Sequence, residues 1–294
     1  MQHVLKVGLI GCGNMGSGMA RQLLSEGCEL MCYDPNQTSL NKVKALGAIA
    51  ASSASRVAEN THIIILSLPK ASVVEAVMTE ISASIQTNSI VLDTSTSEPA
   101  TSQALSKQGE ASGAADADAA RFAFIDGPVS GGPAAANAGT MTMLLGGDRA
   151  AIEKLHPVLE ILTAKTVIVG ASGAGHAAKI ANNMLCAANL VLVAEAVRLG
   201  EAAGVKAEDL LEGINAGSGR SGVSEVNFPK WVLNEGFDSG FTMGLMRKDV
   251  GLAVELARTS GVVLNGFSDI AKLWLKQSSE IPDEADFNEI VKQV

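Results

Sequence analysis

Two patterns of hydrophobic and polar residues divide the chain. In the first part, short runs of β-branched and other apolar residues alternate with segments whose apolar residues have the spacing of an amphipathic helix. Such alternation is typical of βαβ units around a parallel sheet. The predicted strands are residues 4–10, 29–33, 62–66, 90–92, 122–125, 141–145 and 166–169.

After about Ser172 the strand pattern ends, and longer segments rich in Ala, Leu and Glu follow. A chain of 294 residues exceeds one average domain, so we expect two domains, each with its own core. We predict an α/β domain with a doubly wound parallel sheet in residues 1–169 and an all-α second domain in residues 170–294. A ligand cleft between the two domains is expected. Residues 107–121 predict a helix end and an exposed loop, to which we assign no function.

A glycine-rich segment directly follows the first predicted strand. Its spacing is G-x-G-x-x-G, and a helical pattern follows it. In dinucleotide-binding proteins the first glycine permits a tight turn, the second lets the backbone approach the pyrophosphate, and the third allows close packing of helix and strand. The segment therefore predicts a Rossmann-type domain that binds a dinucleotide. The predicted contacts are Gly11, Gly13, Asn14, Met15 and Gly16.

An acidic residue, Asp34, ends the second predicted strand. A carboxylate at this position accepts hydrogen bonds from the adenosine ribose and repels a 2′-phosphate. Asp34 therefore favours NAD over NADP. The alternative, a turn or helix cap before Pro35, fits the same position.

Charge and composition exclude several classes of partner. A net charge of −9 and a pI near 5.0 argue against nucleic acid and anionic membranes. The four cysteines have no metal-site or CxxC spacing, and no signal segment is visible, so we expect reduced thiols, no metal and a cytoplasmic location. The apolar stretch at 184–197 is interrupted by Asn189 and Glu195. We interpret it as a buried core helix, too short and too polar to cross a bilayer.

Several separate motifs resemble one family. They are residues 11–16, Asp93 to Thr96, Asp126 to Pro133 with Ala138 to Thr140, Gly173 to Asn183, and Lys248 to Ala253. Together, in this order, they resemble the β-hydroxyacid dehydrogenase family over essentially the whole chain, and most closely its 3-hydroxyisobutyrate dehydrogenase branch. The resemblance implies hydride transfer between NAD and a small 3-hydroxy acid, whose product is the semialdehyde.

The resemblance implies that Lys179 exchanges the proton of the substrate hydroxyl. Lys179 and Asn183 are one helical turn apart and share a helix face. A lysine in an Ala- and Ile-rich helix must either reach solvent or serve a function, and partial desolvation lowers a lysine pKa toward neutrality. Asn183 is implied to orient the substrate or the lysine.

The remaining site residues follow from the same motifs. Ser130, Gly131 and Gly132 predict a turn whose hydroxyl and amides hold the substrate carboxylate. By resemblance, Thr96 contacts nicotinamide or substrate, and Phe241 closes the pocket. The other implied contacts are Leu68, Pro69 and Lys248 for the coenzyme, with Asp249 in support. Without the resemblance, Lys248 and Asp249 fit equally well as a solvated pair at a helix start.

Two positions depart from the common pattern of this family. Gly127 stands where alanine is usual, and His176 stands where glutamine is common in the branch. A lone histidine near a helix start is more often structural than catalytic. Arg220 is a candidate contact for the distal end of the substrate, with a surface ion pair as the alternative.

The same motifs are compatible with three alternative functions. They are a tartronate or succinic semialdehyde reductase, an imine reductase, and an NAD-binding module without chemistry. Lys179 argues against the imine reductase, and Ser130, Lys179 and Asn183 together argue against an inactive module. The long helix from Gly175 to about Ala203 and the family both imply a homodimer or homotetramer.

Overall fold

The computed structural model describes residues 4–111 and 122–294. Residues 112–121 of the predicted exposed loop lie outside the described residues. The chain forms two compact units, Met1–Lys179 and Ile180–Val294. The first unit therefore includes the beginning of a helix, up to Lys179, that the sequence pattern assigned to the second domain.

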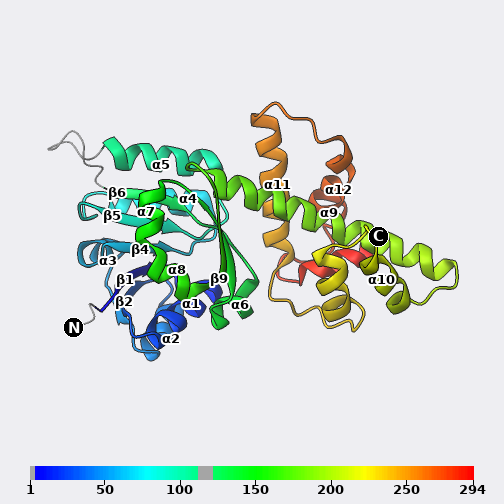
Figure 1. The fold of residues 1–294 in the computed structure, drawn as a ribbon, viewed down its shortest axis with the longest axis horizontal. Helices are drawn as coiled ribbons and strands as arrows, with labels where there is room; N and C mark the ends of the chain where they lie inside the picture. The colour runs from blue at the N-terminus through cyan, green and yellow to red at the C-terminus, as the bar shows by residue number, and fades with distance from the viewer. Residues whose placement is uncertain (1–3, 112–121) are drawn as a thin grey trace. The chain divides into compact units, whose positions relative to one another are not determined.

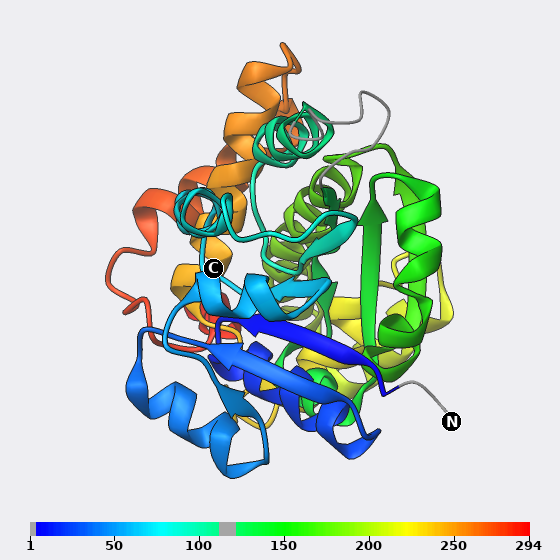
Figure 2. The same ribbon diagram turned by 90° about the vertical axis from the view of Figure 1, so that its left-hand side faces the viewer.

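A nine-stranded sheet forms the centre of the first unit (Figures 1 and 2). Six strands run in the order β3-β2-β1-β4-β5-β6 and are all parallel, which is the order of the doubly wound dinucleotide-binding fold. The strands are β1 Lys6–Ile10, β2 Glu29–Tyr33, β3 Ile49–Ala50, β4 Ile63–Leu66, β5 Ser89–Asp93, β6 Phe122–Asp126, β7 Val129–Ser130, β8 Met141–Gly146 and β9 Thr163–Gly170.

Helices cover both faces of this sheet, so the central strands are mostly apolar and β5 is buried at every position. One buried cluster joins α1, α2, α7 and α8 to one face, and another joins α3, α4 and α5 to the opposite face. The helices are α1 Asn14–Ser25, α2 Gln37–Ala45, α3 Ala54–Asn60, α4 Ala71–Ile81, α5 Pro99–Ala111, α6 Gly132–Ala138, α7 Arg149–Lys154 and α8 His156–Leu162. The predicted doubly wound α/β fold is confirmed.

The sheet is not parallel throughout, which corrects one part of the prediction. β8 pairs antiparallel with β6 and β7, while β9 returns parallel to β8. A parallel return needs a crossover of about a dozen residues or more. The connection between β7 and β8 is built on α6, a helix of 7 residues, so β8 runs back antiparallel. The short strands β3 and β7 were not predicted, because two residues carry no alternation.

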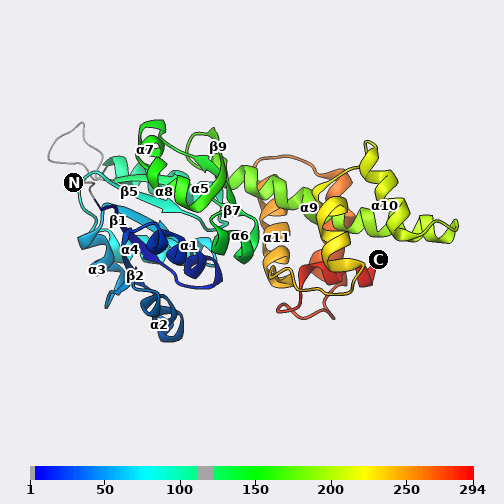
Figure 3. The same cartoon turned by 60° about the horizontal axis from the view of Figure 1, so that its bottom comes forward.

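Helices build the second unit, as predicted. The described residues after β9 contain no strand, and only an isolated bridge joins Thr242 to Asp286. Its core combines residues of α9, α10, α11 and the segments near the C-terminus, and α11 crosses α9 (Figure 3). The helices are α9 Ala174–Ala202, α10 Ala207–Ala216, η1 Val223–Val232, α11 Met243–Thr259, η2 Asn265–Phe267, α12 Ser268–Lys272, η3 Leu273–Gln277 and η4 Phe287–Gln293.

By length and composition, α9 meets the criteria for a membrane-crossing helix, and it is the only helix of the described residues that does. This corrects the prediction that the stretch is too short and too polar. Core helices of water-soluble proteins meet the same criteria. Here Ala187, Leu190, Val191 and Ala194 lie in the core of the second unit, as a buried core helix requires.

Candidate active site

The glycine-rich loop connects β1 to α1 and has the form that a dinucleotide needs. Gly11 has φ +97°, and a Cβ there would lie 2.2 Å from the Ser67 carbonyl oxygen. A Cβ on Gly16 would lie 2.0 Å from the Gly11 carbonyl oxygen. A Cβ on Gly13 would meet no protein atom within 4 Å, so packing does not require a glycine there. The open space beside Gly13 instead suits a pyrophosphate.

The first turn of α1 completes this phosphate site. Gly13 is its N-cap and no side chain caps the turn, and the turn contains no acidic residue. Its backbone N–H groups therefore remain available to an anion, whose charge the helix dipole also stabilises. Asn14 and Met15 begin the helix, and Asn14 is exposed.

Asp34 follows the last residue of β2 and also binds the backbone of the glycine-rich loop. One carboxylate oxygen accepts a hydrogen bond from the Cys12 backbone N–H at 2.7 Å, and the other accepts one from the Asn36 N–H at 2.7 Å. The turn interpretation of Asp34 is therefore present in the structure. It leaves room for the ribose interpretation, because each carboxylate oxygen has two acceptor sites.

The ends of β4 and β5 are tied together by Ser95. The Ser95 hydroxyl accepts a hydrogen bond from the Leu68 N–H at 3.0 Å, and Thr94 donates its hydroxyl to the Leu66 carbonyl at 2.7 Å. Pro69 and Thr96 adjoin the tied residues in sequence. The predicted contacts Leu68, Pro69 and Thr96 thus belong to one assembly at the carboxyl edge of the parallel sheet, where such folds bind ligands.

Ser130 and Lys179 meet, although they come from distant parts of the chain. Ser130 ends β7, where it pairs with Thr142, and Gly131 follows with φ +116°, a conformation that favours glycine. Lys179 Nζ donates a hydrogen bond to Ser130 Oγ at 2.8 Å. Lys179 is only 8% exposed, so its amine does not lie in open solvent. The pair places an amine and a hydroxyl side by side.

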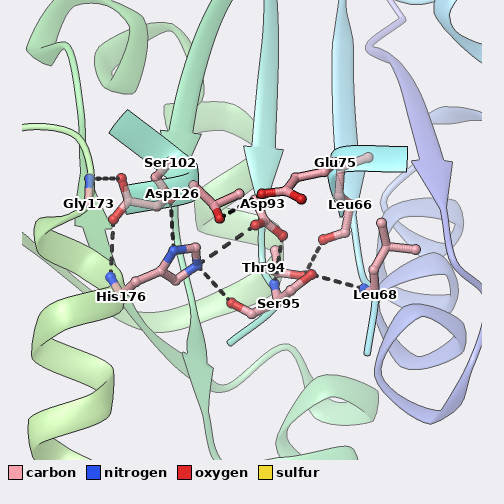
Figure 4. A network of polar contacts seen from close by, with 11 residues as sticks. Leu66, Leu68, Glu75, Asp93, Thr94, Ser95, Ser102, Asp126, Gly173 and His176 are labelled. Atoms are coloured by element: carbon pink, nitrogen blue, oxygen red, sulfur yellow. Dashed lines mark hydrogen bonds and ion pairs between the residues drawn. The ribbon is translucent and has the colours of Figure 1, made fainter. Parts of the chain in front are cut away.

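The start of α9 is fixed by a carboxylate from a distant strand. Asp126, the last residue of β6, accepts hydrogen bonds from the backbone N–H groups of Gly173 at 2.7 Å and His176 at 3.1 Å (Figure 4). These N–H groups have no partner within the helix, and a carboxylate is the ion that a helix N-terminus stabilises. A Cβ on Gly175 would lie 2.8 Å from the same carboxylate. The helix that carries Lys179 is therefore anchored to the strand that leads to Ser130.

His176 connects the same helix to β5 and α5. Its Nδ1 lies 2.8 Å from Ser102 Oγ, and its Nε2 lies 3.0 Å from the Ser95 carbonyl oxygen (Figure 4). Asp93 lies beside it, with Oδ2 at 3.8 Å from Nε2. Burial raises the pKa of the Asp93 carboxyl, although the nearby His176 acts in the opposite direction.

In the second unit, Asn183 and Asp249 form a buried pair. Asn183 Nδ2 donates to Asp249 Oδ2 at 2.5 Å, and Lys248 Nζ lies 3.1 Å from the other carboxylate oxygen. Asn182 donates its amide to Asn183 Oδ1 at 3.0 Å. Asn183 of α9 is thus brought together with Lys248 and Asp249 of α11 within the second unit.

Phe241 lies in the same unit against Phe287, edge to face, with ring centroids 5.2 Å apart. Its role over the nicotinamide stays a prediction. Arg220 is exposed and lies 3.7 Å from Glu225, which agrees with the surface ion pair. Among residues 4–111 and 122–294, no group of three or more His, Cys, Asp or Glu side chains has the arrangement of a metal site.

Comparison with known proteins places this chain in a family. Residues 6–170 match the model of the family described as the NAD binding domain of 6-phosphogluconate dehydrogenase. Residues 173–294 match the one described as NAD-binding of NADP-dependent 3-hydroxyisobutyrate dehydrogenase. The chain belongs to the β-hydroxyacid dehydrogenase family. It is therefore an NAD-dependent dehydrogenase of β-hydroxy acids, as predicted.

Named relatives in this family act on different acids. The chain is 36% identical to 2-(hydroxymethyl)glutarate dehydrogenase of Eubacterium barkeri, over 90% of this chain and 86% of that protein. It is 35% identical to NAD-dependent L-serine dehydrogenase of Pseudomonas aeruginosa, over 87% and 86%. The structure of Mycobacterium tuberculosis 3-hydroxyisobutyrate dehydrogenase with L-serine has a TM-score of 0.89 at 28% identity and covers 98% of each chain.

Sequence reasoning missed the buried network around His176. It named Asp126 only as part of a motif and considered His176 structural, and it gave Asp93, Ser95 and Ser102 no individual role. A signal was present, because Asp93 and Asp126 each directly follow a predicted strand of the parallel sheet. In the structure they are register partners at the ends of β5 and β6. Their joint position next to a histidine required the tertiary fold.

Proposed function

We propose that this β-hydroxyacid dehydrogenase interconverts a 3-hydroxyisobutyrate-type acid, a 3-hydroxypropanoate with a substituent at C2, and its semialdehyde. The observation that carries the proposal is the hydrogen bond between the amine of the buried Lys179 and Ser130 Oγ at 2.8 Å. It joins an amine suited to proton exchange to a hydroxyl and glycine turn suited to a carboxylate.

The acids in the names of the relatives share one structural unit. 3-Hydroxyisobutyrate, L-serine and 2-(hydroxymethyl)glutarate all contain a hydroxymethyl group on the carbon that carries the carboxylate. They differ only in the substituent at that carbon: a methyl group, an ammonium group or a second carboxylate arm. We infer that the same unit is the substrate of this chain and that the surroundings of C2 select among the acids.

The residues divide the work as follows. The glycine loop with the first turn of α1 would hold the phosphates of NAD, and the coenzyme would supply the acceptor for a hydride from the hydroxymethyl carbon. Ser130 and the amides of Gly131 and Gly132 bind the substrate carboxylate and so fix the orientation of the hydroxymethyl group. Lys179 Nζ takes the hydroxyl proton during oxidation and returns it to the carbonyl oxygen during reduction. Asn183 orients the amine or the substrate.

The test is the initial rate of NADH formation by the purified chain. The acids compared are 3-hydroxyisobutyrate, L-serine, 2-(hydroxymethyl)glutarate, glycerate, 4-hydroxybutyrate and lactate, each also with NADP. We expect one of the first three to give the highest kcat/KM and lactate, a 2-hydroxy acid, to be inactive. Preference for glycerate or 4-hydroxybutyrate would instead identify a tartronate or succinic semialdehyde reductase. Binding of NADH without turnover of any acid would contradict the proposal.

We further propose that the chain works as a homodimer or homotetramer in the cytoplasm. Leu185, Leu192 and Leu199 are exposed on α9 at seven-residue spacing, which places them along one side of the helix. A second copy of the chain would bury them. Light scattering of Leu192→Lys beside the natural chain tests this proposal, and an unchanged mass would contradict it. Fractionation of cells that express the chain tests the location.

A further inference from the structure

His176 is a fully buried residue whose side chain joins three parts of the first unit. It lies in the first turn of α9, and its ring contacts Ser102 on α5 and the Ser95 carbonyl after β5 (Figure 4). Ser95 in turn holds the Leu68 backbone. One imidazole therefore connects the helix of Lys179 with both strand-end loops of the predicted coenzyme and substrate contacts.

The partners of the ring fit a neutral imidazole with its proton on Nε2. A carbonyl oxygen only accepts hydrogen bonds, so Nε2 must carry a proton and donate it to Ser95. Nδ1 is then free to accept the proton of the Ser102 hydroxyl at 2.8 Å. The neutral ring with the proton on Nε2 satisfies both ring nitrogens and both partners, without a buried charge.

The surroundings of the ring agree with this neutral form. Asp93 Oδ1 accepts the Ser95 N–H at 3.0 Å, while Oδ2 is buried and has no hydrogen-bond partner among the residues that the structure describes. Burial raises the pKa of this carboxyl, which favours its protonated form. Asp126 uses its two oxygens on the first turn of α9, at the Gly173 and His176 amides. The backbone of His176 is thus fixed by Asp126 and its ring by Ser95 and Ser102.

We propose that His176 is a positioning residue, which sets the place of Lys179 Nζ relative to the Ser95–Thr96 loop without touching substrate. Lys179 follows His176 by one helical turn, so a tilt of this turn moves the amine directly. A strand-end loop that has lost its bond to the ring also moves relative to the helix. The predicted effect of His176 on turnover rests on the proposed function. Its predicted effect on the position of Lys179 does not.

The chemistry of the ring defines matched substitutions. In His176→Gln, the planar amide offers both a donor nitrogen and an acceptor oxygen, so it can replace the donor and the acceptor nitrogen of the neutral ring. His176→Leu fills a similar volume but offers neither, and leaves Ser102 and the Ser95 carbonyl buried without their partner. Ser102→Ala removes only the partner of Nδ1. It replaces His176→Leu as the test variant if His176→Leu does not fold.

The first measurement needs no substrate. Each variant is treated with a limiting amount of acetic anhydride, and the acetylation rates of Lys179 and Lys165 are followed by peptide mass spectrometry. Lys165, exposed on β9, is the internal reference. We expect His176→Leu to raise the acetylation rate of Lys179 about tenfold, because local opening exposes a buried amine, and His176→Gln to keep the natural rate. Ser102→Ala should lie between them.

A second control separates positioning from loss of stability. Ile81→Ala removes buried core volume in α4, whereas the hydrogen-bond and ion-pair partners of His176 shown in Figure 4 lie on or after β5, β6 and α5. It should lower the Tm but leave the acetylation of Lys179 unchanged. Equal acetylation of Lys179 in the natural chain and in His176→Leu would overturn the inference, as would equal acceleration by leucine and glutamine.

The kinetic measurement uses the best acid found for the natural enzyme, with deuterium on its hydroxymethyl carbon. In His176→Leu, kcat should fall about tenfold to a hundredfold, and the isotope effect on kcat should rise because hydride transfer becomes slower than the other steps. His176→Gln should restore both values. An unchanged isotope effect in His176→Leu would overturn the positioning role. If the natural chain oxidises no acid, the proposed function fails, and the acetylation result still decides the inference.

Discussion

Lys179 Nζ donates a hydrogen bond to Ser130 Oγ across 2.8 Å, although the two residues are 49 positions apart in the chain. Three sets of contacts position the two residues. β8 fixes Ser130 through strand pairing, Asp126 caps the start of α9, and His176 anchors the same turn to Ser95. The Lys179 amine is therefore placed by contacts within the first unit.

Lys179→Ala should abolish turnover while coenzyme binding remains. Removal of a proton-transferring group costs about two to four orders of magnitude in kcat. NADH binding depends on the glycine loop, so its Kd, measured by fluorescence titration, should stay close to that of the natural chain. Lys165→Ala, at an exposed lysine, is the matched control and should have normal kcat. Full activity of Lys179→Ala would refute the mechanism.

Asp34→Ser should relax the preference for NAD over NADP. The substitution removes the carboxylate that repels a 2′-phosphate and also the hydrogen bond to the Cys12 amide. We therefore expect weaker NAD binding together with a ratio of kcat/KM values that moves toward NADP. Asp34→Asn, which removes the charge but keeps an acceptor oxygen, should shift the ratio in the same direction with a smaller loss of NAD affinity. If the ratio does not change, Asp34 acts only as a turn and loop residue.

The sequence alone predicted the fold class and its elements well, because each depends on local pattern. The glycine spacing and the buried strands predicted β1, α1 and the doubly wound sheet, and apolar periodicity predicted α9 nearly to its ends. The direction of β8 was not predictable from its own residues, because it depends on the short connection through α6.

The candidate site was predicted less evenly. Ser130, Lys179 and Asn183 stood in recognisable motifs, and the structure brings Ser130 and Lys179 together. The network of Asp93, Asp126 and His176 was not foreseen, because its contacts join positions far apart in the chain. A hydrogen bond between distant residues leaves no periodic signal, so such positioning groups are visible only in the folded chain.

Asn183→Leu should destabilise the second unit. The Asp249 carboxylate is buried and accepts the Asn183 amide at 2.5 Å, so the substitution leaves a buried acceptor without that donor. The expected loss in the free energy of unfolding is about 1 to 3 kcal/mol, measured by urea denaturation. Asn182→Leu is the control, because this neighbour is exposed and its amide only donates to Asn183. Equal losses in the two variants would show that the Asn183–Asp249 bond adds no stability.

Asp93→Asn should change how stability depends on pH. Burial raises the pKa of Asp93 in the folded chain above its ordinary value of 3.8, so between these two pKa values the folded state binds more protons than the unfolded state. The contribution of Asp93 to stability is therefore present below pH 3.8 and is lost as the pH rises through the folded pKa. Asparagine cannot ionise, and its side-chain oxygen can still accept the Ser95 N–H.

The difference in free energy of unfolding between Asp93→Asn and the natural chain should thus move in favour of the variant as the pH rises from about 4 toward 7. Urea denaturation at several pH values measures it. His176 and Asp126, the titratable groups that act on Asp93, are present in both proteins. A difference that stays constant over this range would show that Asp93 titrates alike in the folded and unfolded chain, and the neutral carboxyl beside His176 would then have to be abandoned.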